Sequence, residues 1–353
     1  MMRLLASLRQ IDSLTPIEKA DRIETAWFGG WSVVVQKGLH KQGDTVVYIE
    51  VDSCLPVDNP LFASLAERGT REIEGVKYHR LKTIKLKKQI SQGFVLPVRE
   101  TDIDPSDEAM HGIDLAEHFG IIKWDPEVHQ PNARLAGNAL RGFPTHIIPK
   151  TDQERIQNMP WIIGSDESFE ASIKLDGSSM TVYHCTTDTH VYGVCSRNNQ
   201  LKIDDPINAE NAFVKTAETL DLQRILAELG RNIALQGELI GPGIQGNKEG
   251  LSNYEYHIYD VWDIDQQRYL LPVERRKLVS DLGLKHVPVL DENVVLSSKF
   301  KDVRDVLKYA EGPSLVNKCR EGVVFKSNSY SERNKVTSFK AISNQFLLDN
   351  GDD

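Results

Sequence analysis

Short strand-like segments separated by turn residues fill the sequence between Trp27 and Val98. Apolar and polar residues alternate within them, and glycine, aspartate or proline bounds each one, which is typical of β-strands. Several short strands at such close spacing favour a small barrel. The segments are WSVVVQKG, DTVVYIEVDS, VKYHRLKTIKL and GFVLPV.

One helix is predicted between two of these strands. The apolar spacing in NPLFASLAERG (59–69) is helical and ends at Gly69, a residue type that commonly terminates helices. We interpret the opening residues MMRLLASLRQ as a first strand. Residues 1–125 are therefore expected to form a β-barrel of the OB type with an inserted helix.

The length of 353 residues favours a second domain, because one apolar core rarely grows that far. Residues 126–160 carry closely spaced proline and glycine, and we interpret them as a connector and the start of that domain. From 161 to 353, strands mix with a few helices, the clearest at 209–230, which ends at Gly230. This mixture indicates an α+β fold rather than a doubly wound parallel sheet.

A single lysine, Lys174, ends a predicted strand in SIKLDGSSMTV, directly before the turn residues Asp176 and Gly177. Alone, this K-x-D-G pattern is weak, because solvated lysines at strand ends are common. Its importance depends on charged and aromatic residues farther along the chain. These are Arg197 in VCSRNNQLK, Glu238 in LQGELIGPGIQGN, Tyr259 in YHIYDVWDI, Glu321 and Lys326 in REGVVFKS, and Lys340 in SFKAIS.

A lysine acts as a nucleophile only after it loses a proton, and an ordinary lysine of pKa ~10.4 is less than about 0.1% neutral at pH 7. If Lys326 and Lys340 converge on Lys174, their charges lower its pKa. The same two cations would neutralise charge on a phosphate that the lysine attacks. We therefore expect these three lysines to form one catalytic group.

The carboxylates of Asp176, Glu238 and Glu321 are hard oxygen ligands, the kind that holds Mg²⁺ or Mn²⁺. Positioning and electrostatic stabilisation are most of what phosphoryl-type transfer requires from a protein. The residues therefore predict phosphoryl-type chemistry at Lys174 with a divalent metal as cofactor.

In order and separation, these segments resemble the motif series of covalent nucleotidyltransferases, the superfamily of polynucleotide ligases and RNA capping enzymes. GELIGPGIQGN is similar to an element of RNA ligases that seal nicks. FPTHIIPKTDQERIQN (143–158) resembles a hallmark of the Deinococcus and Naegleria type of ATP-dependent RNA ligase, which carries its OB domain at the N-terminus. The resemblance covers nearly the whole chain. It implies an N-terminal OB-fold β-barrel followed by a nucleotidyltransferase domain of antiparallel sheets with flanking helices over 161–353.

The resemblance also implies a reaction. Lys174 attacks the α-phosphate of ATP, expels pyrophosphate and becomes a lysyl-AMP. AMP then moves to an RNA 5′-phosphate end, and a 3′-OH displaces it to close the strand, at nicks in duplex RNA or RNA/DNA during RNA repair. The implied ATP contacts are Ile173, Lys174, Asp176, Arg197, Glu238, Tyr259, Lys326 and Lys340, and the implied metal ligands are Asp176, Glu238 and Glu321.

Two of these assignments leave alternatives open. Tyr259 is expected to stack on adenine, although aromatic residues in strands usually pack in a core, and Tyr256 is a rival for the adenine. Ser196 and Asn198, on either side of Arg197, either contribute to the site or only form a turn.

The last motif departs from the pattern of related ligases, which often have two lysines there as K-x-K. Ser338 stands in the place of the first lysine. Lys340 is therefore expected to carry this motif, with Lys326 in compensation.

The basic stretch KYHRLKTIKLKKQ (77–89) has two interpretations. It either follows the phosphates of a nicked duplex, because OB barrels commonly present such a surface, or it protects an edge strand from pairing. Neighbouring strand residues point to opposite faces, so not all of its charges can face one way. The candidate RNA contacts are Lys82, Lys85, Lys87, Lys88 and Arg197.

Charge and composition exclude several classes. A net charge of −9 argues against a protein that coats nucleic acid by bulk attraction. No apolar run approaches the ~20 residues of a membrane span, and the N-terminus lacks a secretory pattern. The dispersed cysteines form neither a zinc motif nor a disulfide framework. We therefore expect a soluble monomer with reduced thiols in the cytoplasm or nucleus, not a secreted protein.

Three other functions compete with an RNA ligase: a GTP-using capping guanylyltransferase, a DNA ligase, and a non-catalytic RNA-binding subunit. The N-terminal position of the barrel argues against the first. The presence of Lys174, Glu321 and Lys340 argues against the last. Nucleotide preference and the sugars tolerated at a nick would separate the enzymes.

Overall fold

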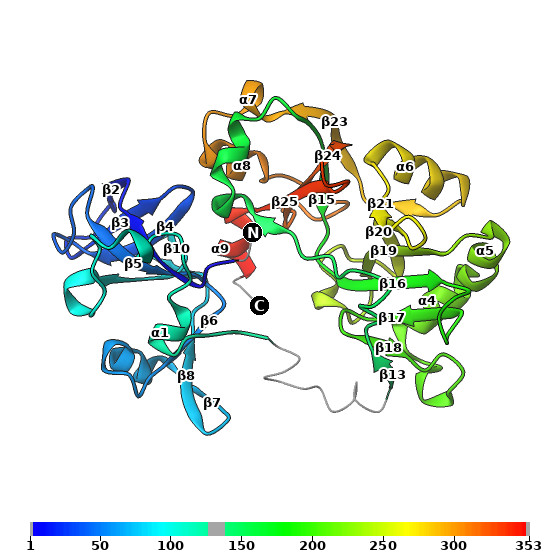
Figure 1. Cartoon of the computed structure of the whole chain (residues 1–353), viewed down its shortest axis with the longest axis horizontal. Coiled ribbons are helices and arrows are strands. Elements are labelled where there is room, and N and C mark those ends of the chain that lie inside the picture. Colours follow the sequence, from blue (N-terminus) through cyan, green and yellow to red (C-terminus); the bar gives the residue numbers. More distant parts are fainter. Residues whose placement is uncertain (1–2, 126–137, 351–353) are drawn as a thin grey trace. The chain divides into compact units, whose positions relative to one another are not determined.

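The computed structural model describes residues 3–125 and 138–350 of the chain (Figure 1). The chain forms two compact units: unit 1 contains Met1–Gln130 with Asn344–Asp353, and unit 2 contains Pro131–Ser343. Helix α9 (Asn344–Asn350) thus groups with unit 1, although its residues fall within the range 161–353 expected for the second domain. Part of the predicted connector, 126–137, lies outside the described residues. Within the described ranges, no helix is long and apolar enough to cross a membrane.

Unit 1 consists mainly of short antiparallel strands, which agrees with the alternating pattern of its sequence. Its sheets have the orders β1-β5-β11, β2-β3-β4, β12-β6-β8-β7 and β10-β9. Two apolar clusters fill it, one including Trp31 and Tyr48 and the other including Leu55 and Phe62. The strands are β1 (Ala6–Gln10), β2 (Ser13–Pro16), β3 (Ile23–Phe28), β4 (Trp31–Gln36), β5 (Thr45–Ile49), β6 (Ser53–Pro56), β7 (Arg71–Ile73), β8 (Val76–Arg80), β9 (Ile84–Leu86), β10 (Gln89–Ser91), β11 (Phe94–Pro97) and β12 (Ile122–Lys123).

The helix predicted at 59–69 is present as the 3₁₀ helix η1 (Pro60–Arg68). The Asn59 side chain accepts a hydrogen bond from the backbone N–H of Leu61 at 3.1 Å, and Pro60 occupies the first helical position, where its missing N–H costs nothing. The helix ends at Gly69, as its sequence predicted. Unit 1 also contains the short helix α1 (Ala116–Phe119).

Unit 2 contains two sheets. The first has the order β13-β18-β17-β16-β19-β20-β21, with β22 pairing in parallel with β20, and the second has the order β14-β25-β24-β15-β23. The strands of the first are β13 (Ala139–Gly142), β16 (Ser178–His184), β17 (Tyr192–Cys195), β18 (Asn199–Leu201), β19 (Ile233–Ile240), β20 (Glu255–Asp263), β21 (Arg268–Tyr269) and β22 (Lys285–His286). Those of the second are β14 (Glu154–Arg155), β15 (Ser168–Lys174), β23 (Val289–Val295), β24 (Gly322–Tyr330) and β25 (Val336–Ile342).

The helix predicted at 209–230 is instead two helices, α4 (Ala212–Thr219) and α5 (Leu222–Leu229). Asp221 between them has a left-handed backbone, with φ of 51°, which no continuous α-helix contains. Helix α4 contacts β17 and helix α5 contacts β16 (Figure 1). The end at Gly230 is confirmed. The other helices of unit 2 are α6 (Pro272–Asp281), α7 (Leu296–Lys299) and α8 (Val303–Tyr309), with 3₁₀ turns between the strands.

Candidate active site

Strand alternation places three lysines on one face of the second sheet of unit 2. Phe169 of β15 packs in an apolar cluster, so Glu170 and, four residues on, Lys174 point to the opposite face. Lys326 of β24 pairs directly with Glu170. Lys340 of β25 is two residues beyond the residue paired with Lys326. Since directly paired residues share a face, all three lysines project from the same side of this sheet.

The glycine that follows Glu321 leaves room for this arrangement. Gly322 pairs with Lys174 across β15 and β24. A Cβ atom on Gly322 would lie 2.2 Å from the carbonyl oxygen of Ala341 on β25. Only glycine at this position therefore allows β24 and β25 to lie so close together beside Lys174.

Lys174 is held by a carboxylate. Its Nζ donates a hydrogen bond to Oε2 of Glu321 at 2.5 Å. Burial lowers the pKa of Lys174, but Glu321, Glu238 and Asp176 outweigh it and raise the pKa above its ordinary value. The expectation that the pKa of Lys174 is lowered overall is thus wrong for the protein alone, because the carboxylates around Nζ outweigh the charge of Lys340.

The same carboxylates also affect one another. Burial, together with the charges of Glu321 and Asp176, raises the pKa of Glu238 to about 8, although Lys174 opposes the shift. Glu238 accepts a hydrogen bond from the Gly177 N–H at 3.1 Å, and Asp176 pairs with Lys248 at 2.5 Å. Among the described residues, no three His, Cys, Asp or Glu side chains form a group that could hold a metal by themselves. A metal here would need oxygen ligands from water or phosphate as well, which is usual for Mg²⁺.

Replacing Glu238 tests this charge balance. Between pH 4.5 and about 8, the folded state holds a proton on Glu238 that the unfolded state releases, so the free energy of unfolding falls as the pH rises. Glu238→Gln should remove this loss, which we expect to be at least ~1 kcal/mol. Urea unfolding of both proteins at pH 5 and pH 8 in metal-free buffer measures it. Glu228→Gln, at an exposed position on α5, is the control. If the free energy of unfolding of Glu238→Gln changes between pH 5 and pH 8 as much as that of the wild type, the raised pKa does not belong to Glu238.

Lys326 belongs to a buried ion network rather than to the immediate surroundings of Lys174. Its Nζ lies 2.5 Å from Oδ2 of Asp260 and donates to the Tyr259 carbonyl oxygen at 2.7 Å. Burial lowers the pKa of Lys326 to about 8, although Asp260 opposes the shift. Arg275 contacts Asp260 at 3.5 Å and also pairs with Glu170. Lys326 is therefore a fixed cation.

Lys340 is the lysine that is electrostatically coupled to Lys174. Burial lowers the pKa of Lys340 to about 8, and the charges of Lys174 and Arg155 lower it too. Asp152 opposes the shift from 3.7 Å, and Glu321 also opposes it. Lys340 thus lies where its charge influences Lys174.

The two candidate tyrosines for adenine lie in different surroundings. In the pairing of β19 with β20, Tyr259 is the extra residue at the register shift. Its hydroxyl lies 3.0 Å from that of Thr151 and 3.1 Å from that of Ser179. Tyr256, by contrast, is 2% exposed in an apolar core and donates its hydroxyl to the Leu235 carbonyl oxygen at 2.8 Å. Packing therefore favours Tyr259 for contact with a base.

The other residues predicted for the site make fewer contacts with the charged groups around Lys174. Ile173 is 6% exposed and belongs to a small apolar cluster against which Tyr259 packs. Arg197 is exposed in the bend after β17 and makes no ion pair with another described residue. Beside it, Ser196 donates its hydroxyl to the Asn199 carbonyl oxygen at 3.3 Å, which supports a turn-forming role. The side chain of Asn198 accepts a hydrogen bond from Lys150.

Three partners of the predicted site were missed from the sequence: Asp260, Lys248 and Asp152. A usable signal existed for Asp260, because an acidic residue inside the apolar run YHIYDVWDI needs a buried partner. No comparable signal marks the other two, which lie in loops and reach Asp176 and Lys340 only through the fold.

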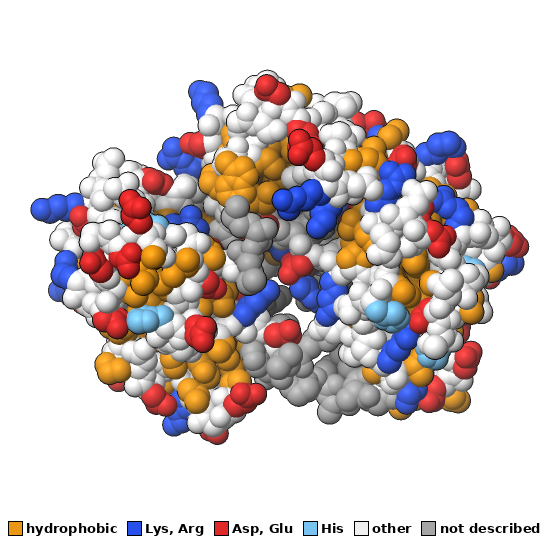
Figure 2. Space-filling view, in the orientation of Figure 1, with side chains coloured by type: hydrophobic (Ala, Val, Ile, Leu, Met, Phe, Trp, Pro, Cys, Tyr) orange, Lys and Arg blue, Asp and Glu red, His pale blue; other side chains and the backbone are white. Residues whose placement is uncertain are grey.

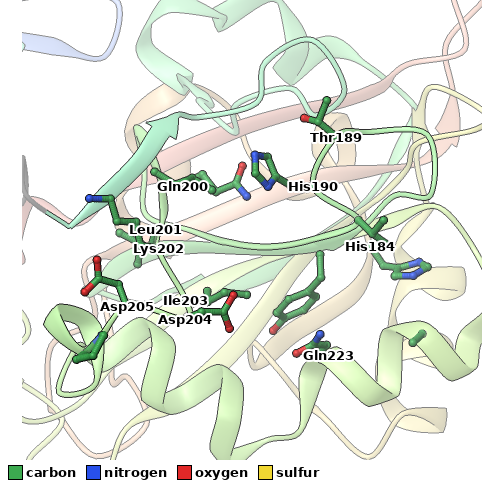
Figure 3. Close-up of a pocket in the computed structure, with 15 residues that line it drawn as sticks. His184, Thr189, His190, Gln200, Leu201, Lys202, Ile203, Asp204, Asp205 and Gln223 are labelled. Carbon is green, nitrogen blue, oxygen red and sulfur yellow. The ribbon is translucent and has the colours of Figure 1, made fainter.

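A groove of about 900 Å³ lies elsewhere in unit 2 (Figure 3). It runs along β18 and α5, and Lys202, Asp204 and Gln223 are among the residues that line it. None of the predicted site residues lines this groove, so the arrangement around Lys174 remains the better candidate for chemistry.

Comparisons with known proteins agree with the geometry. An RNA ligase family model matches residues 167–342, and an OB-fold domain model matches residues 5–98. The chain is 40% identical in sequence to Naegleria gruberi RNA ligase. Similar structures of that ligase were solved with pyrophosphate, as a mutant with AMP and Mn, and as a mutant with ATP and Mn. TM-scores are 0.81–0.83, and 97–98% of this chain and 98% of that chain are covered. No curated protein sequence matches.

The chain combines an OB-fold unit with a two-sheet unit that carries Lys174. Together with the comparisons, this combination defines a ligase, which is an enzyme and not a binding protein. The chain belongs to the RNA ligase family. The predicted family, enzyme class and α+β fold with an N-terminal OB domain are thereby confirmed.

Proposed function

We propose that this RNA ligase uses ATP and a divalent metal, forms a lysyl-AMP on Lys174, and joins a 3′-OH to a 5′-phosphate at nicks in duplex RNA or RNA/DNA. The observation that carries the proposal is the position of Lys174, whose Nζ lies 2.5 Å from Glu321 on a face shared with Lys340. Structures of the Naegleria gruberi ligase with ATP, AMP, pyrophosphate and Mn support the choice of nucleotide and metal.

The residues around Lys174 fit a divalent cation. Their carboxylates are hard oxygen donors. Burial, with Glu321 and Asp176, raises the pKa of Glu238 to about 8, so a cation bound here would stabilise its ionised form. Asp176, Glu238 and Glu321 would hold the ion, with ATP phosphates or water as further ligands. When bound, the ion supplies positive charge that offsets these carboxylates and so favours the neutral form of Lys174.

The chain's own residues then account for the chemistry. The neutral amine of Lys174 attacks the α-phosphorus of ATP, the bond to the bridging oxygen breaks, and pyrophosphate leaves. The hydrogen bond from Nζ to Glu321 aims the amine and offers its proton an acceptor. Lys340, coupled to Lys174, stabilises the charge that develops on the phosphate. Tyr259 would pack against the adenine.

The departure at Ser338 fits this scheme through the strand pairing. Ser338 of β25 pairs directly with Lys326 of β24, so the two side chains share one row. Lys326 therefore supplies a positive charge next to the position of the missing lysine, and its ion pair with Asp260 fixes its side chain. We propose that Lys326 contacts the nucleotide from there, while Lys340 acts beside Lys174.

Incubation with α-labelled ATP or GTP tests the proposal. We expect label on the protein from ATP with Mg²⁺ or Mn²⁺, none after chelation, and little from GTP. Nicked duplexes with RNA or DNA on each side of the break then define the substrate. Label from GTP alone would favour a capping enzyme, equal sealing of all-DNA nicks would favour a DNA ligase, and RNA binding without label would favour a non-catalytic subunit.

We further propose that the enzyme acts as a monomer in the cytoplasm or nucleus. The cysteines of the described residues are free rather than paired, which supports a reducing compartment.

A further inference from the structure

The hairpin of β9 and β10 carries positive charge without interruption. Residues 75–99 contain seven Lys and Arg and no Asp or Glu, although the whole chain has a net charge of −9. On the face shown in Figure 2, by contrast, Lys and Arg are interspersed with Asp and Glu. Lys82, just before the hairpin, and the hairpin lysines Lys85, Lys87 and Lys88 are exposed. They make no ion pair or hydrogen bond with another described residue.

The base of this hairpin is anchored in unit 1, and its tip is not. The Ile90 carbonyl oxygen accepts a hydrogen bond from the Ser32 hydroxyl at 3.2 Å, and the Ser91 hydroxyl accepts one from the Val34 N–H at 3.0 Å. Ile90 is 8% exposed. From Ile84 to Gln89, every residue is exposed. The hairpin is thus an arm on a fixed base.

One face of the arm carries two exposed aliphatic side chains. Ile84 and Leu86 lie on the same side of β9 and are 42% and 37% exposed. Their cross-strand partners on that face are Ser91 and Gln89. Aliphatic side chains left uncovered beside lysines suit a partner that combines negative charge with flat, partly apolar groups, as the phosphates, sugars and bases of RNA do.

The turn places lysine where lysine is disfavoured. Lys87 and Lys88 have φ of 49° and 66°, so both central positions of the turn are left-handed. Such two-residue hairpin turns prefer Asn-Gly, because these residues adopt positive φ most readily. Two lysines here put charge at the tip at the expense of conformational preference, which points to a role for the charge itself.

We propose that this basic hairpin binds the phosphodiester backbone of the RNA substrate. The lysines contact phosphates, and Ile84 and Leu86 contribute contacts that do not depend on salt. The inference rests on the proposed function, since it assigns the surface that holds the RNA to be sealed. Edge protection is the competing explanation for the lysines. It does not account for Lys87 and Lys88, because a turn has no free strand edge to protect.

Neutralising the arm in the full chain tests the proposal. The quadruple variant Lys82→Gln, Lys85→Gln, Lys87→Gln, Lys88→Gln should bind nicked duplex RNA at least about tenfold more weakly at low salt. The slope of log K against log salt should become shallower by about 3, since each lost phosphate contact removes about 0.7–0.9. Fluorescence anisotropy over a KCl series measures both. The matched control removes the same charge from other exposed sites of unit 1: Lys19→Gln, Lys37→Gln, Lys41→Gln and Lys123→Gln.

Protein–AMP formation separates this inference from the proposed function. Both quadruple variants should accept label from ATP as the wild type does, because none of these lysines lies in unit 2. If the wild type also takes up no label, the proposed function is wrong, whatever the hairpin binds. Unchanged RNA affinity and salt slope in the hairpin variant would overturn the proposal, and aggregation together with unchanged affinity would establish edge protection.

A second variant guards against a folding defect. Lys87→Asn with Lys88→Gly supplies the residues that this turn prefers. It should raise the melting temperature and yet weaken RNA binding severalfold, because two charges are lost. Stability and affinity then change in opposite directions, which misfolding does not produce. Higher stability with undiminished RNA affinity would also overturn the proposal.

Discussion

Lys174→Ala is expected to lower protein–AMP formation from labelled ATP by at least about three orders of magnitude, because the attacking amine is gone. Label retained on the protein after gel electrophoresis measures the effect. Lys277→Ala, an exposed lysine on α6 that pairs with Asp281, is the matched control and should label normally. Label at the wild-type level in Lys174→Ala would refute the assignment of the nucleophile.

The same variant should still act on RNA that is already adenylylated. In that step a 3′-OH displaces AMP from the RNA end, and no lysine nucleophile is required. Lys174→Ala should therefore seal a nick whose 5′ end carries AMP, although it seals no nick from ATP. Failure of both reactions, with a melting temperature far below that of the wild type, would indicate damage to the fold rather than loss of the nucleophile.

Asp260→Ala should destabilise the protein by roughly 3–5 kcal/mol, because it leaves the cation of Lys326 buried without its main partner. The side chain of Lys326 is only 3% exposed, so water replaces the lost carboxylate poorly. Urea unfolding at pH 7 measures the loss. The double variant Asp260→Ala with Lys326→Met removes both charges and should recover much of it.

The pH dependence identifies the cause. Lys326 has a folded pKa of about 8, below its ordinary 10.5, so between these values the unfolded state holds a proton that the folded state lacks. The free energy of unfolding therefore rises with pH across that window. In Asp260→Ala the window should extend below pH 8, because Asp260 raises the pKa of Lys326 in the wild type. A loss of stability independent of pH would contradict this account.

Protein–AMP formation by the double variant should show whether Lys326 and Asp260 serve only the fold or also the reaction. If Lys326 contacts the nucleotide, the double variant should fold well and still form protein–AMP poorly. Recovery of activity together with stability would show that Lys326 and Asp260 only support the fold.

Local patterns were sufficient for much of the fold. The strands around WSVVVQKG and GFVLPV, the helix that ends at Gly69, and the helical segment that ends at Gly230 lie where the sequence predicted them. Alternation and turn residues act over a few neighbouring positions, so a sequence can be read for them directly. The break at Asp221 was missed, because no glycine or proline marks the position where the backbone becomes left-handed.

The order of motifs also marked Lys174 and its carboxylates, but it did not say which charges meet. Tyr256 and Tyr259 are three residues apart on one strand, so alternation turns them to opposite faces. Only the fold shows that the first faces the core and the second lies beside Thr151 and Ser179. Lys326 was expected beside Lys174, yet its Nζ pairs with Asp260.

The sequence by itself thus determined the family and the two-part organisation, and it marked the lysine that we propose as the nucleophile. Only the tertiary structure decided the direction of the pKa shift at Lys174, which the carboxylates raise rather than the lysines lower. The physical reason is that a pKa depends on distance and burial. Lys174 and Glu321 are 147 positions apart in the chain, and the pairing of β15 with β24 brings them to 2.5 Å.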